Sequence, residues 1–238
     1  TYDVLSKVDL SKTVDKDTYK EKLEKYQEKI RALQAEAFYK GVSAVFAFEG
    51  WDAAGKGGAI RRLTAAMDPL SFAVYPYAAP NAVERMYHYL WRFWQNVPAP
   101  GEISIFDRTW YGRVMVERIE KLTPDVDWRR GYAEINEMEK QWSEANMVLA
   151  KFWLQIDQEE QARRFKDREE NPEKEWKITE EDWRNRAKWS DYEAAVNEMI
   201  ARTNTDYAPW IIVEANSKYY ARLKVLETVI DLLEKKLK

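Results

Sequence analysis

The stretch AVFAFEGWDAAGKGGAIRR, residues 44–62, decides how this chain folds. The apolar run that opens it, Val42 to Phe48, predicts a strand that is buried on both faces. Residues 50–56, GWDAAGK, match the first seven positions of the phosphate-binding loop pattern G-x-x-x-x-G-K, and a helix-compatible segment, residues 59–67, follows. Strand, glycine loop and helix in this order bring backbone N–H groups, the positive end of a helix and the mobile charge of Lys56 to one anion. The stretch therefore predicts a phosphate site.

The eighth position of the loop departs from the pattern. Gly57 stands where Ser or Thr usually ligates magnesium. Either the loop is not a nucleotide site, or another residue supplies the oxygen that faces the metal, and Asp52 within the loop is the obvious candidate. The alternative to a phosphate site is a glycine-rich turn that only packs a helix on a sheet.

Length and composition exclude several classes of protein. A chain of 238 residues can form one domain with a full core, and its net charge of −3 excludes a globally basic nucleic-acid binder, though not a local basic groove. The absence of cysteine excludes a disulfide framework, a thiol nucleophile and a zinc site with Cys ligands. No apolar run is long enough to span a membrane, and no signal segment is visible. We expect a cytoplasmic protein with neither a membrane nor a nucleic acid as partner.

Strands alternate with helices along the chain, which predicts a three-layer α/β/α sandwich with a five-stranded parallel sheet, similar to P-loop kinases. Beyond the first strand, we predict strands at residues 72–75, 103–106, 147–156 and 210–213, and helices at 16–39, 81–94, 128–145, 190–202 and 219–237. Residues 1–15 have no periodic face and predict an extended arm. We interpret residues 1–238 as a single phosphotransferase domain, with an N-terminal arm and helix over 1–40 and a lid over about 160–190. The only histidine, His88, is expected to pack or lie at the surface.

The third strand ends in Asp107 and Arg108. An acidic residue at the end of an apolar strand, downstream of a phosphate loop, is the Walker-B arrangement, in which the carboxylate holds magnesium. Arg108 and Arg113 follow the carboxyl end of that strand, where ligands of open α/β sheets bind. Residues 214–216, at the end of the fifth strand, are candidates to face a nucleotide.

The segment from Glu159 to Lys188 changes character, because basic residues alternate with acids and with Trp176 and Trp183. It reads equally well as a solvated surface laced with ion pairs or as a helical lid that closes Arg and Lys over a phosphorylated substrate. Its position after the fourth strand favours the lid, since phosphoryl transfer benefits from a closure that excludes water.

Four separate blocks together resemble the polyphosphate kinase 2 family: GWDAAGKGG at 50–58, IFDRTWYGR at 105–113, RRFKDR at 163–168 and WKITEEDWRNR at 176–186. The resemblance covers the chain from about Lys16 to Leu237. The segments FEGWDAAGKGG, YHYLWRFW and VEAN are most similar to the polyphosphate:AMP phosphotransferase branch. The family implies inorganic polyphosphate as phosphoryl donor, AMP or ADP (or GMP or GDP) as acceptor, a requirement for Mg²⁺, reversibility, and a homodimer or homotetramer.

The resemblance also assigns roles to residues. It implies that Asp52 and Asp107 are the acidic pair associated with the metal and the acceptor phosphate, and that Lys56, Arg108 and Arg113 complete the catalytic set. Asp52 either helps to hold the metal or orients the attacking acceptor phosphate. Phosphate or polyphosphate contacts are implied for Gly50, Ala53, Ala54, Gly55, Lys56, Gly57, Gly58, Arg163, Arg164 and Arg168. Nucleotide or lid contacts are implied for Arg61, Glu117, Trp176, Lys177 and Arg184. Thr109 stands where the family commonly has Ser, which keeps the hydroxyl, and Gly112 stands where some relatives have Asn.

Two other functions stay open at this point. One is an ATP-dependent nucleoside or nucleoside-monophosphate kinase of similar fold, against which the missing Ser or Thr after Lys56 argues. The other is a regulator that binds polyphosphate or nucleotide without catalysis, against which the joint presence of Asp52, Lys56 and Asp107 argues.

Overall fold

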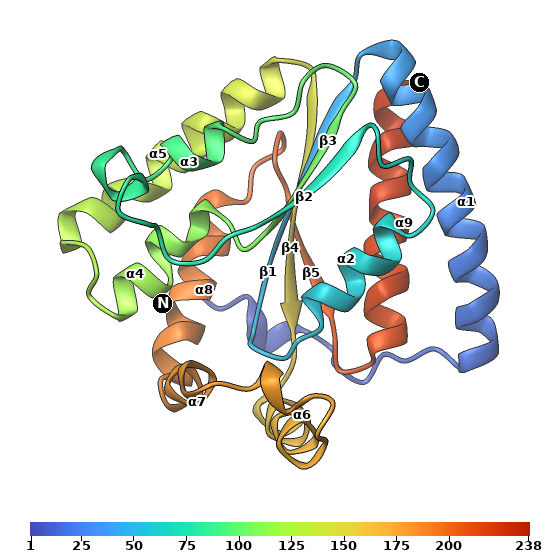
Figure 1. Cartoon of the computed structure of the whole chain (residues 1–238). Helices are drawn as coiled ribbons and strands as arrows, with labels where there is room; N and C mark the ends of the chain where they lie inside the picture. Colours follow the sequence, from blue (N-terminus) through green and yellow to red (C-terminus); the bar gives the residue numbers. More distant parts are fainter.

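Five parallel strands form the centre of the protein, which a computed structural model describes over all residues, 1–238. Their order across the sheet is β2-β3-β1-β4-β5, which confirms the predicted parallel α/β fold (Figure 1). The strands are β1 (Ser43–Gly50), β2 (Phe72–Pro76), β3 (Ile103–Asp107), β4 (Met147–Gln155) and β5 (Trp210–Glu214). The first strand pairs with β3 on one side and with β4 on the other, so the phosphate loop leaves the sheet at its middle.

Helices cover both faces of the sheet. The helices are α1 (Lys16–Lys40), α2 (Lys56–Thr64), α3 (Trp91–Trp94), α4 (Val116–Ile119), α5 (Asp125–Glu144), α6 (Gln158–Glu170), α7 (Glu180–Ala187), α8 (Trp189–Thr203) and α9 (Lys218–Leu237). Short 3-10 turns are η1 (Leu5–Lys7), η2 (Glu84–Met86), η3 (Trp110–Val114) and η4 (Glu175–Lys177). In Figure 1, α1, α2 and α9 lie on one side of the sheet and α5 and α8 on the other, while α6 and α7 lie beyond the end of the strands.

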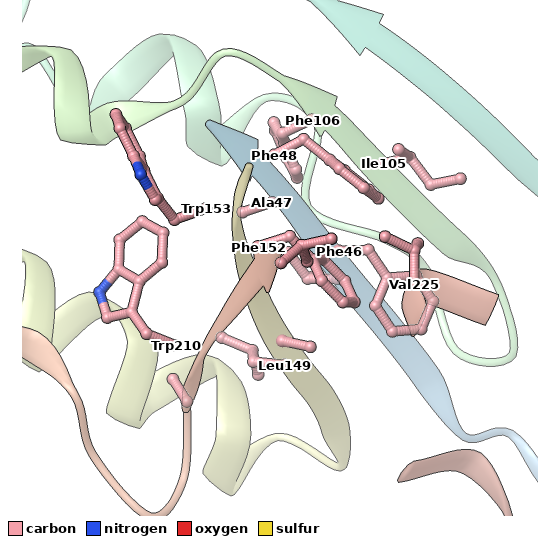
Figure 2. Packing of buried hydrophobic residues seen from close by; sticks show 14 of the residues in the cluster. Phe46, Ala47, Phe48, Ile105, Phe106, Leu149, Phe152, Trp153, Trp210 and Val225 are labelled. Carbon is pink, nitrogen blue, oxygen red and sulfur yellow. The ribbon is translucent and has the colours of Figure 1, made fainter. Parts of the chain in front are cut away.

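The core confirms that β1 is buried on both faces. Alternate residues of a strand point to opposite faces, and Phe46 and Phe48 lie on the face that α9 covers through Val225 (Figure 2). Phe48 stacks on Phe152 of β4 with ring centroids 4.9 Å apart. Trp153 lies on the opposite face. Full burial of one such side chain contributes about 1.5–3 kcal/mol, so the strand that carries the loop is firmly anchored.

A buried ion pair interrupts the apolar core on the α5 side. Lys151 of β4 lies 2.9 Å from Glu139 of α5, and it also donates to the hydroxyl of Tyr111 and to the carbonyl of Thr203. Burial raises the pKa of Glu139 and lowers that of Lys151, while the contact between them opposes both shifts. Removing one partner of such a pair costs about 3–5 kcal/mol, so the cluster joins β4, α5, η3 and α8 in one arrangement.

Two predictions on local structure are wrong in part. Residues 81–94 do not form one helix: Tyr87 is extended, with φ −108° and ψ 163°, and separates η2 from α3. Asn81 does cap the first turn, through a 2.8 Å bond from the N–H of Glu84. The N-terminal arm is not extended throughout, because η1 interrupts it, and the N–H groups of Val4 and Leu5 anchor it by donating to Asn197 of α8.

The first and last helices pack against each other over the sheet (Figure 1). An ion pair of Lys29 with Glu234 joins them at 2.9 Å. The faces of α1 and α9 that contact each other are therefore not available to a partner subunit. The homo-oligomer stays a prediction. No helix has the length and apolar composition that a membrane span requires.

Candidate active site

The loop between β1 and α2 has the backbone of an anion site. Gly55, directly before α2, has a left-handed φ of 99°, and a Cβ on Gly50 would come within 2.9 Å of the carbonyl of Leu154. Glycine is the residue that satisfies both demands. The helix begins at Lys56, three residues earlier than predicted, so the N–H groups of its first turn open toward the loop.

Gly57, unlike Gly50, is not required by the packing of the protein itself. A Cβ on Gly57 would have no protein atom within 4 Å, so the packing of this chain does not exclude a side chain there. A Cβ on Gly58, by contrast, would lie 3.1 Å from the guanidinium of Arg222. The open space over Gly57 is what a ligand that approaches the backbone closely would occupy.

The charged residues of the two predicted motifs meet at the carboxyl end of the sheet. Lys56 Nζ lies 3.6 Å from Asp107 Oδ1, and both side chains are partly exposed. Burial raises the pKa of Asp52, a shift that the positive charges of Arg108 and Lys56 partly offset. Arg108 itself is exposed. Asp52, Lys56, Asp107 and Arg108 thus form one cluster, with two carboxylates and two cations facing the loop.

The predicted lid contacts this cluster directly. Asn185 of α7 donates to Asp52 Oδ2 at 2.9 Å. Gln161 of α6 donates to the backbone carbonyl of Asp52 at 3.0 Å, and Arg186 donates to the side-chain oxygen of Gln161 at 3.1 Å. Two successive lid helices therefore hold the same loop residue, one through its side chain and one through its backbone.

Arg164 is the most buried of the three lid arginines to which the resemblance assigns phosphate contacts. Its guanidinium is buried and donates to the carbonyls of Ala53, Ala215 and Asn216, while its Nε–H donates to Glu160. Four of its five N–H groups donate within the protein, so Arg164 braces the loop, and its contact with phosphate stays a prediction. It also stabilises Ala53, whose φ of 66° is unusual for a residue with a side chain.

The remaining lid residues lie nearer to solvent. Arg163 pairs with Glu160, and Arg168 points to the carbonyl of Lys177 at 3.5 Å. Trp176 is 76% exposed with the ammonium of Lys177 over its ring, which leaves a large aromatic surface free. Arg184 on α7 and Arg61 on α2 are exposed as well.

Arg113 and Glu117 form a separate group. Arg113 lies 3.8 Å from Glu117, donates to Thr123 at 2.5 Å and stacks on the ring of Tyr89. Its Nε–H is buried without a partner. The structure therefore places Arg113 against the segment before α3, while Lys56 and Asp107 meet at the loop.

The profile of the polyphosphate kinase 2 family matches residues 13–238. The chain belongs to the polyphosphate kinase 2 family. The polyphosphate:AMP phosphotransferase of Pseudomonas aeruginosa is 52% identical over 231 residues, which are 97% of this chain and 47% of that protein. An ADP-polyphosphate phosphotransferase of Rhizobium meliloti is 38% identical over 221 residues, 93% of this chain and 78% of that protein.

A solved polyphosphate kinase 2 from Arthrobacter aurescens has the same fold. It superposes with a TM-score of 0.94 at 32% identity, over 98% of this chain and 86% of that one. The chain spans about half the length of the Pseudomonas relative, so its own activity has to be argued from its own site.

Several residues around this polyphosphate kinase 2 site have no role assigned from the sequence. Asn185 lies within the block 176–186 and Gln161 in none of the four blocks, and neither received a role, because an amide in a charged helix carries no pattern of its own. Trp51 of the loop stacks on Trp189, at the start of α8, with ring centroids 3.6 Å apart, and it shares the acceptor Gln155 with Trp153. The high tryptophan content was the only hint of this packing.

Two predicted positions do not face the loop with their side chains. Glu214 pairs with Lys224 at 2.7 Å, and Asn216 bonds to Asp157 at 3.0 Å. His88 lies at the surface, 3.1 Å from Glu134.

Proposed function

We propose that this chain transfers a phosphoryl group from inorganic polyphosphate to a nucleoside monophosphate, AMP to ADP, and that it also accepts a nucleoside diphosphate and runs in reverse. The observation that carries the proposal is the cluster of Lys56, Asp107 and Asp52 around a loop whose eighth residue is Gly57. The similarity to polyphosphate:AMP phosphotransferases supports AMP as acceptor.

The proposed step needs no strong base. A phosphate oxygen of AMP, already anionic near neutral pH, attacks the terminal phosphorus of polyphosphate. The bond from that phosphorus to the bridging oxygen breaks, and the shortened chain leaves with the electron pair. Charge spreads over the peripheral oxygens in the loose transition state, so fixed positive groups do most of the catalysis. Lys56, Arg108 and the N–H groups at the start of α2 supply them.

The two carboxylates fit a magnesium ion that binds together with the substrate. No group of three acidic or histidine side chains forms a closed metal site in the structure. Mg²⁺ commonly binds through one or two carboxylates and completes its shell with phosphate oxygens and water. Asp52 and Asp107 would hold it, and Asn185 occupies only one oxygen of Asp52. When bound, the ion neutralises phosphate oxygens as they gain charge.

The lid helices would bind the rest of the donor and exclude water. Arg163, Arg168, Lys177 and Arg184 have charges at or near the surface, and Trp176 offers a ring for stacking. Closure would strengthen each electrostatic contact inside the site by lowering the local dielectric constant. The contact of Asn185 with Asp52 supports such a closure.

The test is a reconstitution with the purified chain. The chain is incubated with Mg²⁺, long-chain polyphosphate and AMP, and nucleotides are separated by chromatography. We expect ADP to appear, with ATP following if the diphosphate is also accepted. A chain that folds and yet forms neither product contradicts the proposal.

A further inference from the structure

Glu49 is a buried carboxylate directly before the phosphate loop, and the mechanism above does not use it. It lies near the end of β1 and is 7% exposed. Its Oε1 accepts two hydrogen bonds from Thr109, one from the backbone N–H at 2.8 Å and one from the hydroxyl at 2.9 Å. Burial raises the pKa of Glu49, and the charge of Lys56 and the bonds from Thr109 act in the opposite direction.

The turn that donates these bonds carries two of the residues to which we assign catalysis, Asp107 and Arg108. Arg108 has a left-handed φ of 65°. A residue with a Cβ keeps this conformation only where its surroundings impose it. β1 imposes it on both sides of Arg108, because the Arg108 N–H donates to the carbonyl of Phe48 at 3.1 Å and the Thr109 N–H donates to Glu49.

The hydroxyl of Thr109 extends this link to the next element. Thr109 is 4% exposed, and its Oγ1 donates to Glu49 while accepting the N–H of Tyr111 at 3.1 Å, which caps η3. One carboxylate oxygen thus fixes the end of β3 and the start of η3 relative to the strand that carries the phosphate loop. A serine would preserve both bonds of the hydroxyl, whereas a valine would remove both.

We propose that Glu49 and Thr109 are positioning residues for phosphoryl transfer, which hold Asp107 and Arg108 against the phosphate loop without touching substrate. The inference rests on the function proposed above. A positioning role for Glu49 and Thr109 can be distinguished from a purely structural role by its effect on kcat. A structural pair changes stability alone, whereas a positioning pair changes kcat in molecules that remain folded, because a shift of about 1 Å in a reacting group can cost a hundredfold in rate.

The test compares Thr109→Val and Thr109→Ser with a matched control, Thr203→Val. Thr203 is also fully buried, and its hydroxyl also bridges two partners, the indole of Trp210 and the carbonyl of Met199. It lies against Trp210, the first residue of β5, and therefore at the opposite end of the parallel strands from the phosphate loop. Rates with polyphosphate and AMP are measured well below each melting temperature, together with the KM of both substrates.

We expect Thr109→Val to lower kcat about tenfold or more with the KM for polyphosphate changed less than about threefold, and Thr109→Ser to recover most of the rate. Thr203→Val should lose thermal stability and keep its kcat. A kcat for Thr109→Val equal to that of Thr203→Val, or a serine variant as slow as the valine one, overturns the inference. A wild-type chain without activity contradicts the proposed function instead.

Glu49→Gln tests the hydrogen bonds between Glu49 and Thr109 from the acceptor side. It replaces Thr109→Val as the test if that variant does not fold. An amide oxygen accepts the two bonds more weakly than a carboxylate, because the bonds are no longer charge-assisted. We expect kcat to fall about threefold or more with the fold intact. A folded Glu49→Gln variant with the wild-type kcat overturns the role of Glu49.

Discussion

The amide of Asn185 donates to Oδ2 of Asp52 across 2.9 Å, and this bond joins helix α7 to the phosphate loop. The two residues are far apart in the sequence, and the bond exists only while α7 lies over the loop. Tyr192 contacts the other end of the same amide at 3.4 Å, which sets its orientation. If the predicted lid closes on the loop through Asp52, enclosure of the substrate is coupled to the geometry of the site.

Removing this bond should loosen the lid without unfolding the chain. We expect Asn185→Ala to lower kcat/KM about threefold to tenfold, since one hydrogen bond to a charged group contributes about 1.5–3 kcal/mol, part of which water replaces. Limited proteolysis should cut residues 171–188 faster. Asn171→Ala is the control, because Asn171 lies in the same segment and caps only the N–H of Glu173. Equal proteolysis of both variants would contradict the closure.

The cluster around the loop should be indispensable. We expect Lys56→Ala and Asp107→Ala each to lower the rate at least about a hundredfold, the effect of removing one preorganised charged group. Both side chains are partly exposed, so the melting temperature should change little. Steady-state rates and thermal melts on the same samples check this. Near-normal turnover in either variant would remove that residue from the mechanism.

Gly57 should separate activity from stability. We expect Gly57→Ala to raise the free energy of unfolding slightly, by at most about 1 kcal/mol, because alanine is the better helix former and meets no protein atom here. The added methyl group would fill the space proposed for phosphate and lower kcat/KM about tenfold or more. Gly58→Ala is the comparison, since it has the same gain in helix propensity but brings its methyl group within 3.1 Å of the flexible guanidinium of Arg222, so it should stabilise the fold less than Gly57→Ala. A fully active Gly57→Ala chain would show that no ligand approaches this backbone.

We propose that Lys218, the first residue of α9, adds to the positive charge beside Arg164 and Arg168 of the predicted lid, so that donor binding depends on pH through it. Partial burial and the charges of Arg164, Arg222 and neighbouring cations lower the pKa of Lys218 to about 8. The ammonium is therefore charged below about pH 8 and neutral above it, so the KM for polyphosphate should rise between pH 7 and 9. Lys218→Arg, which stays charged throughout, should flatten this rise. The same pH profile in both proteins would exclude Lys218 from donor binding.

Much of the fold follows from local patterns. The buried run of β1, the glycines of the loop and the apolar strand before Asp107 each dictate their structure through nearby residues, and all are confirmed. The segment 81–94 shows where prediction from local patterns fails. Its aromatic residues imitate a helical period, but the stack of Tyr87 on Trp91 and the bond from the Leu90 N–H to the ring of His88 favour an irregular chain.

The site was predictable only where chemistry coincides with a motif. Asp52, Lys56 and Asp107 stand in recognisable patterns, and they do meet in the fold. Glu49 and Asn185 act through partners 60 and 133 residues away, and no local pattern indicates such pairs. The roles of Arg164 as a brace and of Lys151 as a buried cation likewise depend on tertiary contacts.

The most direct test of the central claim is the rate with each donor under identical conditions. Purified chain with Mg²⁺ and AMP receives either long-chain polyphosphate or ATP, and ADP formation is followed by chromatography, with labelled AMP so that product from ATP is distinguished. We expect rapid formation of labelled ADP with polyphosphate and little with ATP, because Gly57 replaces the hydroxyl of conventional kinases. A chain that uses ATP and ignores polyphosphate would contradict it.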